Sequence, residues 1–416
     1  MDRSLKHFSI PFKIFIGSAE EIFYNGVAVI NEGRIEKIYT NNIPDNIPPL
    51  ICNARNNIVH PGFVNSHTHL ELSFLKNQIS TRAPFPDWIE SLVLKKRVTP
   101  KAVIEDKMKD AIKSLYEART IAIGDISSEQ IAFGLLSNSM LKGTIFYELL
   151  GLDDSKLDAK LVRLKENVAQ KSKRLIGGIS PHSLYSSSLK LLKESYQLAS
   201  NENIPFAIHL AESQEETEYI KYGRGEFVDM FARLKLKDSY SLNNSNLDPL
   251  ELLDHIGCMD KSILIHMNYP SENFKKLLNR KNNSIIWSPG ANNWFKRVTK
   301  YPIVEYLNLG VNISLGTDGL GSNNSLDIRR EAILAKNSIP SLSYKKLFKL
   351  ITENGAVTLQ NKSLQGKLYK NGPFDAVVIH DVDDKIEDIF EFILTNETNS
   401  FSLFIDGMQV YQKEIK

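Results

Sequence analysis

Two histidines one residue apart, His67 and His69, follow an apolar run at residues 58–64 after two polar residues. In a β-strand, residues i and i+2 point the same way, so both imidazoles can face one point beyond the strand end. Neutral imidazole is a common ligand for zinc, iron and similar metals. A lone His-x-His pair also occurs on surface loops, so the rest of the chain decides between a metal site and two loop histidines.

Further polar residues stand at the ends of other apolar runs. His182, His209 and His266 each close or directly follow such a run, and Asp318 comes three residues after another. A single histidine in this position is commonly a core residue with satisfied hydrogen bonds. Five of the nine histidines share it, however, and the carboxyl ends of parallel barrel strands meet on one face. We therefore expect these side chains to converge on a metal site.

The middle of the chain alternates strand-like and helix-like segments. Apolar residues recur at helical spacing over residues 101–118, 189–199 and 344–359. The expected strands cover residues 58–64, 120–125, 143–149, 175–180, 205–209, 262–266, 284–287 and 312–315. Eight β units with helices between them predict an α/β fold, a (β/α)8 TIM barrel. Residues 238–249 read as a loop by composition.

Both ends of the chain have a different pattern, which is typical of β structure. Residues 26–30 and 35–39 flank a turn at 31–33 and predict a hairpin, and residues 374–379, 401–405 and 408–411 are strand-like. Neither end has enough strands to cover its own apolar face. We expect one small β-sandwich domain built from residues 1–58 and 363–416, with the barrel at residues 59–362 inserted between them.

Composition excludes several classes of protein. The net charge of +2 gives no strong field for nucleic acid or a membrane surface, and no apolar stretch approaches a membrane span. The two cysteines, Cys52 and Cys258, provide no disulfide framework, and the N-terminus has no signal-peptide pattern. These features predict a soluble, cytoplasmic protein.

The motifs resemble those of the amidohydrolase superfamily, in its branch of nucleobase and purine-nucleoside deaminases. The resemblance covers essentially the whole length and rests on the order of the segments at residues 61–70, 209–212, 266, 288–292, 316–319 and 366–378. It implies one divalent metal ion, zinc or iron, held by four side chains: His67, His69, His209 and Asp318. It also implies proton transfer by Glu212 and His266. Two-metal relatives carry a lysine at the end of the fourth strand, whereas this chain has His182, so we expect a single ion.

The physical chemistry of these residue types agrees with that assignment. Three imidazoles and one carboxylate leave an open coordination position for water, whose pKa a bound metal lowers. Asp318 can accept a proton from that water, and His266 can orient it. Glu212 could protonate a ring nitrogen of the substrate, which makes the adjacent carbon electrophilic and leads to loss of ammonia. Taken alone, Glu212 would also fit a first-turn helix residue favoured by the helix dipole.

The resemblance extends to the substrate, a small purine nucleoside. His182 matches the family position that touches a ribose, and residues 83–89 resemble the family's lid. Within it, Trp88 could cover a base and Asp87 could bind a sugar hydroxyl, although plain loop packing explains the lid equally well. Glu71 and Glu148 are further candidates near strand ends.

The pattern at residues 67–73, together with the lid, most resembles the aminodeoxyfutalosine deaminases of menaquinone-making bacteria. This implies deamination of 6-amino-6-deoxyfutalosine, whose distal carboxylate would need a basic partner. The candidates are Arg82, Lys296 and Arg297. Alternatives are a deaminase of S-adenosylhomocysteine, methylthioadenosine, adenosine or guanine, a chlorohydrolase or formimino hydrolase, and a non-enzymatic relative. Such a relative usually lacks metal ligands, and here none is missing. The resemblance also allows a homodimer.

Overall fold

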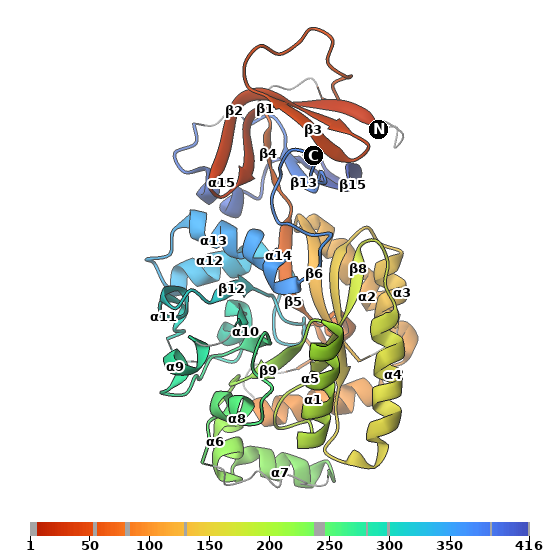
Figure 1. Ribbon diagram of the computed structural model, residues 1–416, viewed down its shortest axis with the longest axis vertical. Coiled ribbons are helices and arrows are strands. Elements are labelled where there is room, and N and C mark those ends of the chain that lie inside the picture. The colour runs from red at the N-terminus through yellow and green to blue at the C-terminus, as the bar shows by residue number, and fades with distance from the viewer. Residues whose placement is uncertain are drawn as a thin grey trace.

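The computed structural model describes residues 6–52, 56–79, 84–128, 131–236, 246–279, 282–297, 300–382 and 385–414. The two ends of the chain lie together in one β domain, at the top of Figure 1, and the larger domain lies below it. The β domain contains a seven-stranded sheet in the order β15-β14-β13-β4-β1-β2-β3. Its strands are β1 (His7–Ser18), β2 (Glu21–Asn31), β3 (Arg34–Tyr39), β4 (Ile58–Pro61), β13 (Ala376–Ile379), β14 (Phe401–Ile405) and β15 (Met408–Lys413). The prediction that both termini build one β domain is therefore confirmed.

The larger domain is the predicted barrel. Two four-stranded parallel sheets, β5-β6-β7-β8 and β9-β10-β11-β12, are joined by a parallel bridge between Ile179 and Phe206. On the other side β12 contacts β5, where the Asp318 amide donates to the His67 carbonyl over 3.0 Å. The strands are β5 (Phe63–Thr68), β6 (Thr120–Ser127), β7 (Lys142–Leu149), β8 (Leu175–Pro181), β9 (Ala207–Leu210), β10 (Ile263–His266), β11 (Ser284–Trp287) and β12 (Asn312–Leu315).

Helices surround this barrel and cover its far end, where α1 and α7 lie away from the β domain (Figure 1). No helix among the described residues is both long and apolar enough to cross a membrane. The helices are α1 (Phe85–Val98), α2 (Lys101–Glu117), α3 (Ile131–Ser137), α4 (Leu157–Ala169), α5 (Leu189–Glu202), α6 (Gln214–Tyr222), α7 (Glu226–Arg233), α8 (Pro249–His255), α9 (Phe274–Leu278), α10 (Pro289–Trp294), α11 (Ile303–Asn308), α12 (Ile328–Ser338), α13 (Tyr344–Leu350), α14 (Glu353–Leu359) and α15 (Ile389–Thr395). The described part of the chain also contains two 3₁₀ helices, η1 (Leu70–Leu75) and η2 (Asp154–Lys156).

The expected strand at residues 58–64 is wrong as a single element. β4 pairs with β1 and β13 in the β domain, whereas β5 pairs with β6 in the barrel. Gly62 stands between them, and a Cβ there would lie 2.2 Å from Ile121 Cγ2, so only glycine fits this close crossing. One apolar run therefore serves two sheets. We propose the domain boundary at Gly62; the second boundary, at residue 363, stays a prediction.

Two other segments differ from their predicted form. The helix expected over residues 344–359 is interrupted between α13 and α14, where Thr352 has the non-helical dihedrals φ −130° and ψ −94°. The predicted loop at 238–249 lies mostly outside the described residues, and its last residue, Pro249, begins α8. Apolar spacing alone does not register the break at Thr352, because α13 and α14 both keep buried residues.

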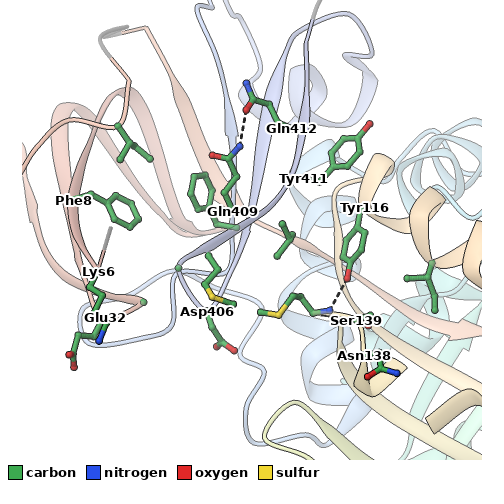
Figure 2. A pocket seen from close by; sticks show the side chains of 18 of the residues that line it. Lys6, Phe8, Glu32, Tyr116, Asn138, Ser139, Asp406, Gln409, Tyr411 and Gln412 are labelled. Atoms are coloured by element: carbon green, nitrogen blue, oxygen red, sulfur yellow. Dashed lines mark hydrogen bonds between the residues drawn. The ribbon is translucent and has the colours of Figure 1, made fainter. Parts of the chain in front are cut away.

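A cavity of about 1290 Å³ lies between the β domain and the barrel (Figure 2). Phe8 and Asp406 line it from the β domain, and Tyr116 and Asn138 line it from the barrel side. None of the histidines or carboxylates expected at the metal site borders this cavity. We place the chemistry at the histidines, because a cavity at a domain seam needs no catalytic function.

A buried ion-pair cluster also joins the two domains. Lys142 at the start of β7 is 2% exposed at its side chain, and its Nζ lies 2.6 Å from Asp375 Oδ2 and 2.7 Å from Asp406 Oδ1. Both aspartates belong to the C-terminal part of the β domain, next to β13 and β14. A buried charge without its partner is costly, so this cluster ties the barrel to the β domain.

Replacement of Lys142 by alanine is expected to lower the free energy of unfolding by about 3–5 kcal/mol, because it leaves Asp375 buried and uncompensated. Chemical denaturation measures the change. Lys107→Ala is the control, since Lys107 forms a pair with Asp110 whose side chains are 51% and 70% exposed, and such pairs contribute about 0–1 kcal/mol. Equal stability losses in the two variants would show that the Lys142 cluster does not hold the domains together.

Candidate metal centre and active site

Four side chains from three barrel strand ends converge on one point. His67 and His69 come from the end of β5, His209 from β9, and Asp318 follows β12. Asp318 Oδ1 lies 3.4 Å from His67 Nε2 and 3.7 Å from His69 Nε2. His69 Nε2 and His209 Nε2 face each other at 3.2 Å. The donors form two overlapping groups that could hold a metal ion, His67 with His69 and Asp318, and His67 with His209 and His266, and within each group the donor atoms lie within 4.8 Å of one another. Nitrogen and oxygen donors of these types are ligands for a divalent metal such as zinc.

The donors are also in the right chemical form for a metal. Burial lowers the pKa of His69 to about 3 and holds the pKa of His209 well below its usual value, so both imidazoles are neutral. Burial alone would raise the pKa of Asp318, but the surrounding imidazoles lower it well below its usual range, and the carboxylate is ionised. Both ring nitrogens of His67 are buried without a hydrogen-bond partner among the described residues. Neutral imidazoles around an ionised carboxylate fit a bound cation.

Unusual backbone conformations aim these side chains. Ala211, His266 and Asp318 have φ values of 51°, 74° and 60° at or after the ends of β9, β10 and β12. Such values are uncommon outside glycine and persist where the surrounding structure holds them. Here a hydrogen bond holds the turn after β10: the amide of Met267 donates to the carbonyl of Leu210, the last residue of β9, over 3.0 Å. Strained turns at strand ends thus fix the direction of the polar side chains.

A glycine allows the close approach of β12 to β5. A Cβ on Gly316 would lie 2.5 Å from the Cβ of His67 and 2.9 Å from its backbone nitrogen. Any larger residue would therefore push Asp318 away from His67. Gly316 therefore has a structural role: it lets Asp318, two residues later, lie close to His67.

Outer groups orient the ligands. His209 Nδ1 lies 3.1 Å from the His182 carbonyl, which can only accept, so Nδ1 carries the proton and Nε2 is left to bind a metal. Ser322 Oγ donates to Asp318 Oδ2 over 2.6 Å, and the Gly319 amide donates to Asp318 Oδ1 over 2.8 Å. Sequence analysis missed Ser322, although a hydroxyl four residues after the aspartate was a visible signal.

Glu212 lies beside this cluster. Its Oε2 is 3.7 Å from His266 Nε2, and both side chains are buried. Burial raises the pKa of Glu212 to about 7, while Arg297, 2.9 Å away, opposes that rise. A carboxyl group with this pKa can both accept and give a proton near neutral pH. Sequence analysis missed the pairing with Arg297, which it considered only as a partner for a substrate carboxylate.

The neighbouring Glu216 holds the turn that carries Glu212. It accepts hydrogen bonds from the amides of Ala211 and Glu212 over 3.2 and 2.7 Å. Sequence analysis also missed this residue, because a glutamate in the first turn of a helix carries no distinguishing signal.

The residues predicted to contact substrate do not all lie at the histidine cluster. The ring of His182 stacks on His209, with centroids 4.6 Å apart. Trp88 is buried in α1 and donates from Nε1 to the Gly321 carbonyl over 3.1 Å. Asp87 is half exposed and binds Arg233 of α7 over 2.7 Å, so in this structure it faces α7.

Two further acidic residues lie near strand ends: Glu148 at the end of β7, and Glu71 in η1, just after β5. Glu148 is partly buried at the end of β7, and burial together with the charge of Glu71 raises its pKa to about 7. Glu71 itself is bound by Lys96 Nζ over 2.6 Å. The roles of all these residues toward substrate stay predictions.

Fold and site together define the class: a (β/α)8 barrel whose strand ends carry a cluster of three histidines and an aspartate next to the buried pair of Glu212 and His266. The chain belongs to the Amidohydrolase family, whose model matches residues 58–409. By this membership it is an aminohydrolase-type enzyme, as the motifs predicted.

The individual relatives share low sequence identity with this chain. A 5'-deoxyadenosine deaminase from Methanosphaera stadtmanae is 26% identical over 351 residues, covering 80% of this chain and 76% of the relative. A 5-methylthioadenosine/S-adenosylhomocysteine deaminase from Thermococcus kodakarensis is 27% identical, covering 74% and 71%. The crystal structure of Helicobacter pylori aminofutalosine deaminase with methylthio-coformycin superposes with a TM-score of 0.84 at 22% identity, over 97% of this chain and all of that chain. At that identity the superposition supports the fold.

Proposed function

We propose that this protein is a metal-dependent hydrolytic deaminase of an adenine-type base. The observation that carries the proposal is the convergence of three buried imidazoles and an ionised carboxylate beside the buried pair of Glu212 and His266. The metal would be one divalent ion, zinc or iron, held by four residues: His67, His69, His209 and Asp318. Its chemistry would be Lewis-acid activation of water.

The chain's own residues do the remaining work. Asp318 is ionised and buried, so it can accept the proton that the attacking water loses. Glu212 Oε2 can deliver a proton to a ring nitrogen of the base, which makes the adjacent carbon open to attack. His266, opposite that oxygen, can hold the attacking water or stabilise the developing negative charge. The proton taken up by Asp318 then passes to the leaving amine, the bond between carbon and that nitrogen breaks, and ammonia is released. The hydroxyl proton of the addition product returns to Glu212 as the carbonyl forms, which restores both carboxylates to their starting states.

The substrate we propose is 6-amino-6-deoxyfutalosine. This choice rests on the motif at residues 67–73 and on the lid segment with Phe85 and Trp88, which here packs into α1. A second candidate class, 5'-deoxyadenosine and methylthioadenosine, is favoured by the names of the two sequence relatives. The two classes share the adenine ring and differ only at the far end of the ribose.

The distal carboxylate of the futalosine compound needs a cationic partner. Arg82 lies outside the described residues, and the side chain of Arg297 is bound to Glu212. Lys296 is exposed just after α10, which leaves its ammonium group available for this role. We therefore propose Lys296 over Arg297 as the partner.

An ammonia-release assay over a panel of purine nucleosides tests the proposal. We expect 6-amino-6-deoxyfutalosine to give the highest kcat/KM, and Lys296→Ala to raise KM for it while leaving KM for 5'-deoxyadenosine unchanged, because only the former carries a carboxylate. A wide preference for 5'-deoxyadenosine or S-adenosylhomocysteine would reject the futalosine substrate and keep the deaminase. Hydrolysis of only chlorinated or formimino compounds would reject the deaminase as well.

A further inference from the structure

A closed ring of hydrogen bonds starts and ends on Glu212. Arg297 Nη2 donates to Glu212 Oε1 over 2.9 Å, and Arg297 Nη1 donates to Asn292 Oδ1 over 3.2 Å. Asn292 Nδ2 donates to Asn268 Oδ1 over 2.9 Å. Asn268 Nδ2 donates to the backbone carbonyl of Glu212 over 3.0 Å, which closes the ring. The side chain of Glu212 is thereby fixed relative to its own backbone by residues that follow β10 and β11.

The ring engages only one oxygen of the Glu212 carboxylate. Oε1 is held by Arg297, whereas Oε2 faces His266 Nε2 at 3.7 Å. With Oε1 occupied, the oxygen that points toward His266 and the metal-ligand cluster is the one left to exchange a proton. The arrangement therefore selects which carboxylate oxygen reacts as well as where it lies.

Arg297 is itself firmly placed. Its side chain is 5% exposed, and its guanidinium carbon lies 4.5 Å from the ring centre of Phe295 and 5.3 Å from that of Phe85. Phe85 belongs to α1, so the same guanidinium that binds Glu212 also packs against the expected lid. Arginine suits this position because its planar fork can stack on aromatic rings while it donates to two separate oxygens.

We propose that Arg297 is a positioning residue that holds Glu212 for proton transfer and connects it to α1. The inference rests on the proposed proton-transfer role of Glu212. It predicts that Arg297 acts on turnover, whereas a residue that binds the substrate's distal group acts on KM.

The test compares Arg297→Ala and Arg297→Lys with the wild-type enzyme, each metal-loaded and assayed on the best substrate of the panel. We expect Arg297→Ala to lower kcat by about 10²-fold with KM and metal content nearly unchanged, because a small misplacement of a reacting group can cost that much. Arg297→Lys should recover part of the loss. Added guanidinium should recover part of it in the alanine variant. Arg224→Ala is the matched control, because Arg224 pairs with Glu218 where both side chains are exposed.

A double variant separates this inference from the function on which it rests. If Arg297 acts through Glu212, then Arg297→Ala should add little to the loss already caused by Glu212→Gln. A raised KM with wild-type kcat would overturn the inference in favour of substrate binding by Arg297. A lowered KM with wild-type kcat would overturn it too, because it would show that Arg297 only occupies the space into which the purine base of the substrate binds. Wild-type kcat in Glu212→Gln would instead reject the proposed role of Glu212.

Discussion

Replacement of Glu212 by glutamine is expected to lower kcat by about 10²–10⁴-fold while the fold and the bound metal are retained. The amide has nearly the same shape as the carboxyl group but cannot deliver a proton to a ring nitrogen. It can still accept from Arg297 Nη2 through its oxygen, which preserves the existing 2.9 Å contact. The measurement is kcat on the best purine substrate, with metal content by elemental analysis of the same sample.

Glu215→Gln is the matched control for Glu212→Gln. Glu215 lies in the first turn of α6, only three residues further on, and loses the same charge in this change. We expect nearly wild-type kcat for Glu215→Gln, because no described hydrogen bond joins its side chain to Glu212 and its charge affects the pKa of Glu212 less than burial, Arg297 or Asp318 do. Equal kcat in the two variants would remove Glu212 from the mechanism and leave the helix-dipole explanation of this residue.

The convergence of the proposed metal ligands could be predicted from the sequence, because their positions follow a rule of the fold. Polar residues at the ends of parallel barrel strands meet on one face. His67, His209 and Asp318 stand at such ends, and the structure brings their donor atoms within 4.8 Å of their cluster neighbours. The barrel strands could be predicted from their continuous apolar runs, because both faces of each strand are buried, and the helices from the single apolar face that each packs inward.

The partners of those ligands could not be predicted, because they depend on which loops meet in space. Arg297 and Glu212 are 85 positions apart and become neighbours only through the loops after β9 and β11. A charged residue in a loop gives no sequence signal that separates a buried partner of a carboxylate from a solvated surface group. The division at Gly62 was hidden for another reason, since both halves of that apolar run are fully buried.

The expected lid is a second case in which the residue type alone did not predict the contact that the side chain makes. Asp87 has the residue type to bind a sugar hydroxyl, but in the structure its carboxylate lies 2.7 Å from Arg233 of α7. Trp88 from the same turn points inward and is buried. Sequence alone places both residues on one segment, and only the packing of α1 against α7 separates the inward residue from the outward one.

Replacement of Asp318 by asparagine is expected to remove both metal and turnover. The ionised carboxylate is the only anionic donor of the four-ligand set, and its Oδ1 lies within 3.7 Å of both His67 Nε2 and His69 Nε2. A neutral amide keeps the shape but neither the negative charge that holds a divalent ion nor the capacity to accept a proton from water. We expect kcat of the metal-supplemented variant to fall by at least about 10²–10⁴-fold.

Elemental analysis should find one zinc or iron ion per wild-type chain and far less in Asp318→Asn and in a His67→Ala/His69→Ala double variant. Ser322→Ala is the graded control, because it keeps the carboxylate and removes only the 2.6 Å hydrogen bond to Oδ2. A lost outer partner of this kind typically weakens metal affinity by about 10–100-fold, so metal should bind at higher concentrations and restore turnover. Full metal content and wild-type kcat in Asp318→Asn would show that the cluster is not the metal site, and two ions per wild-type chain at full activity would reject a single-metal centre.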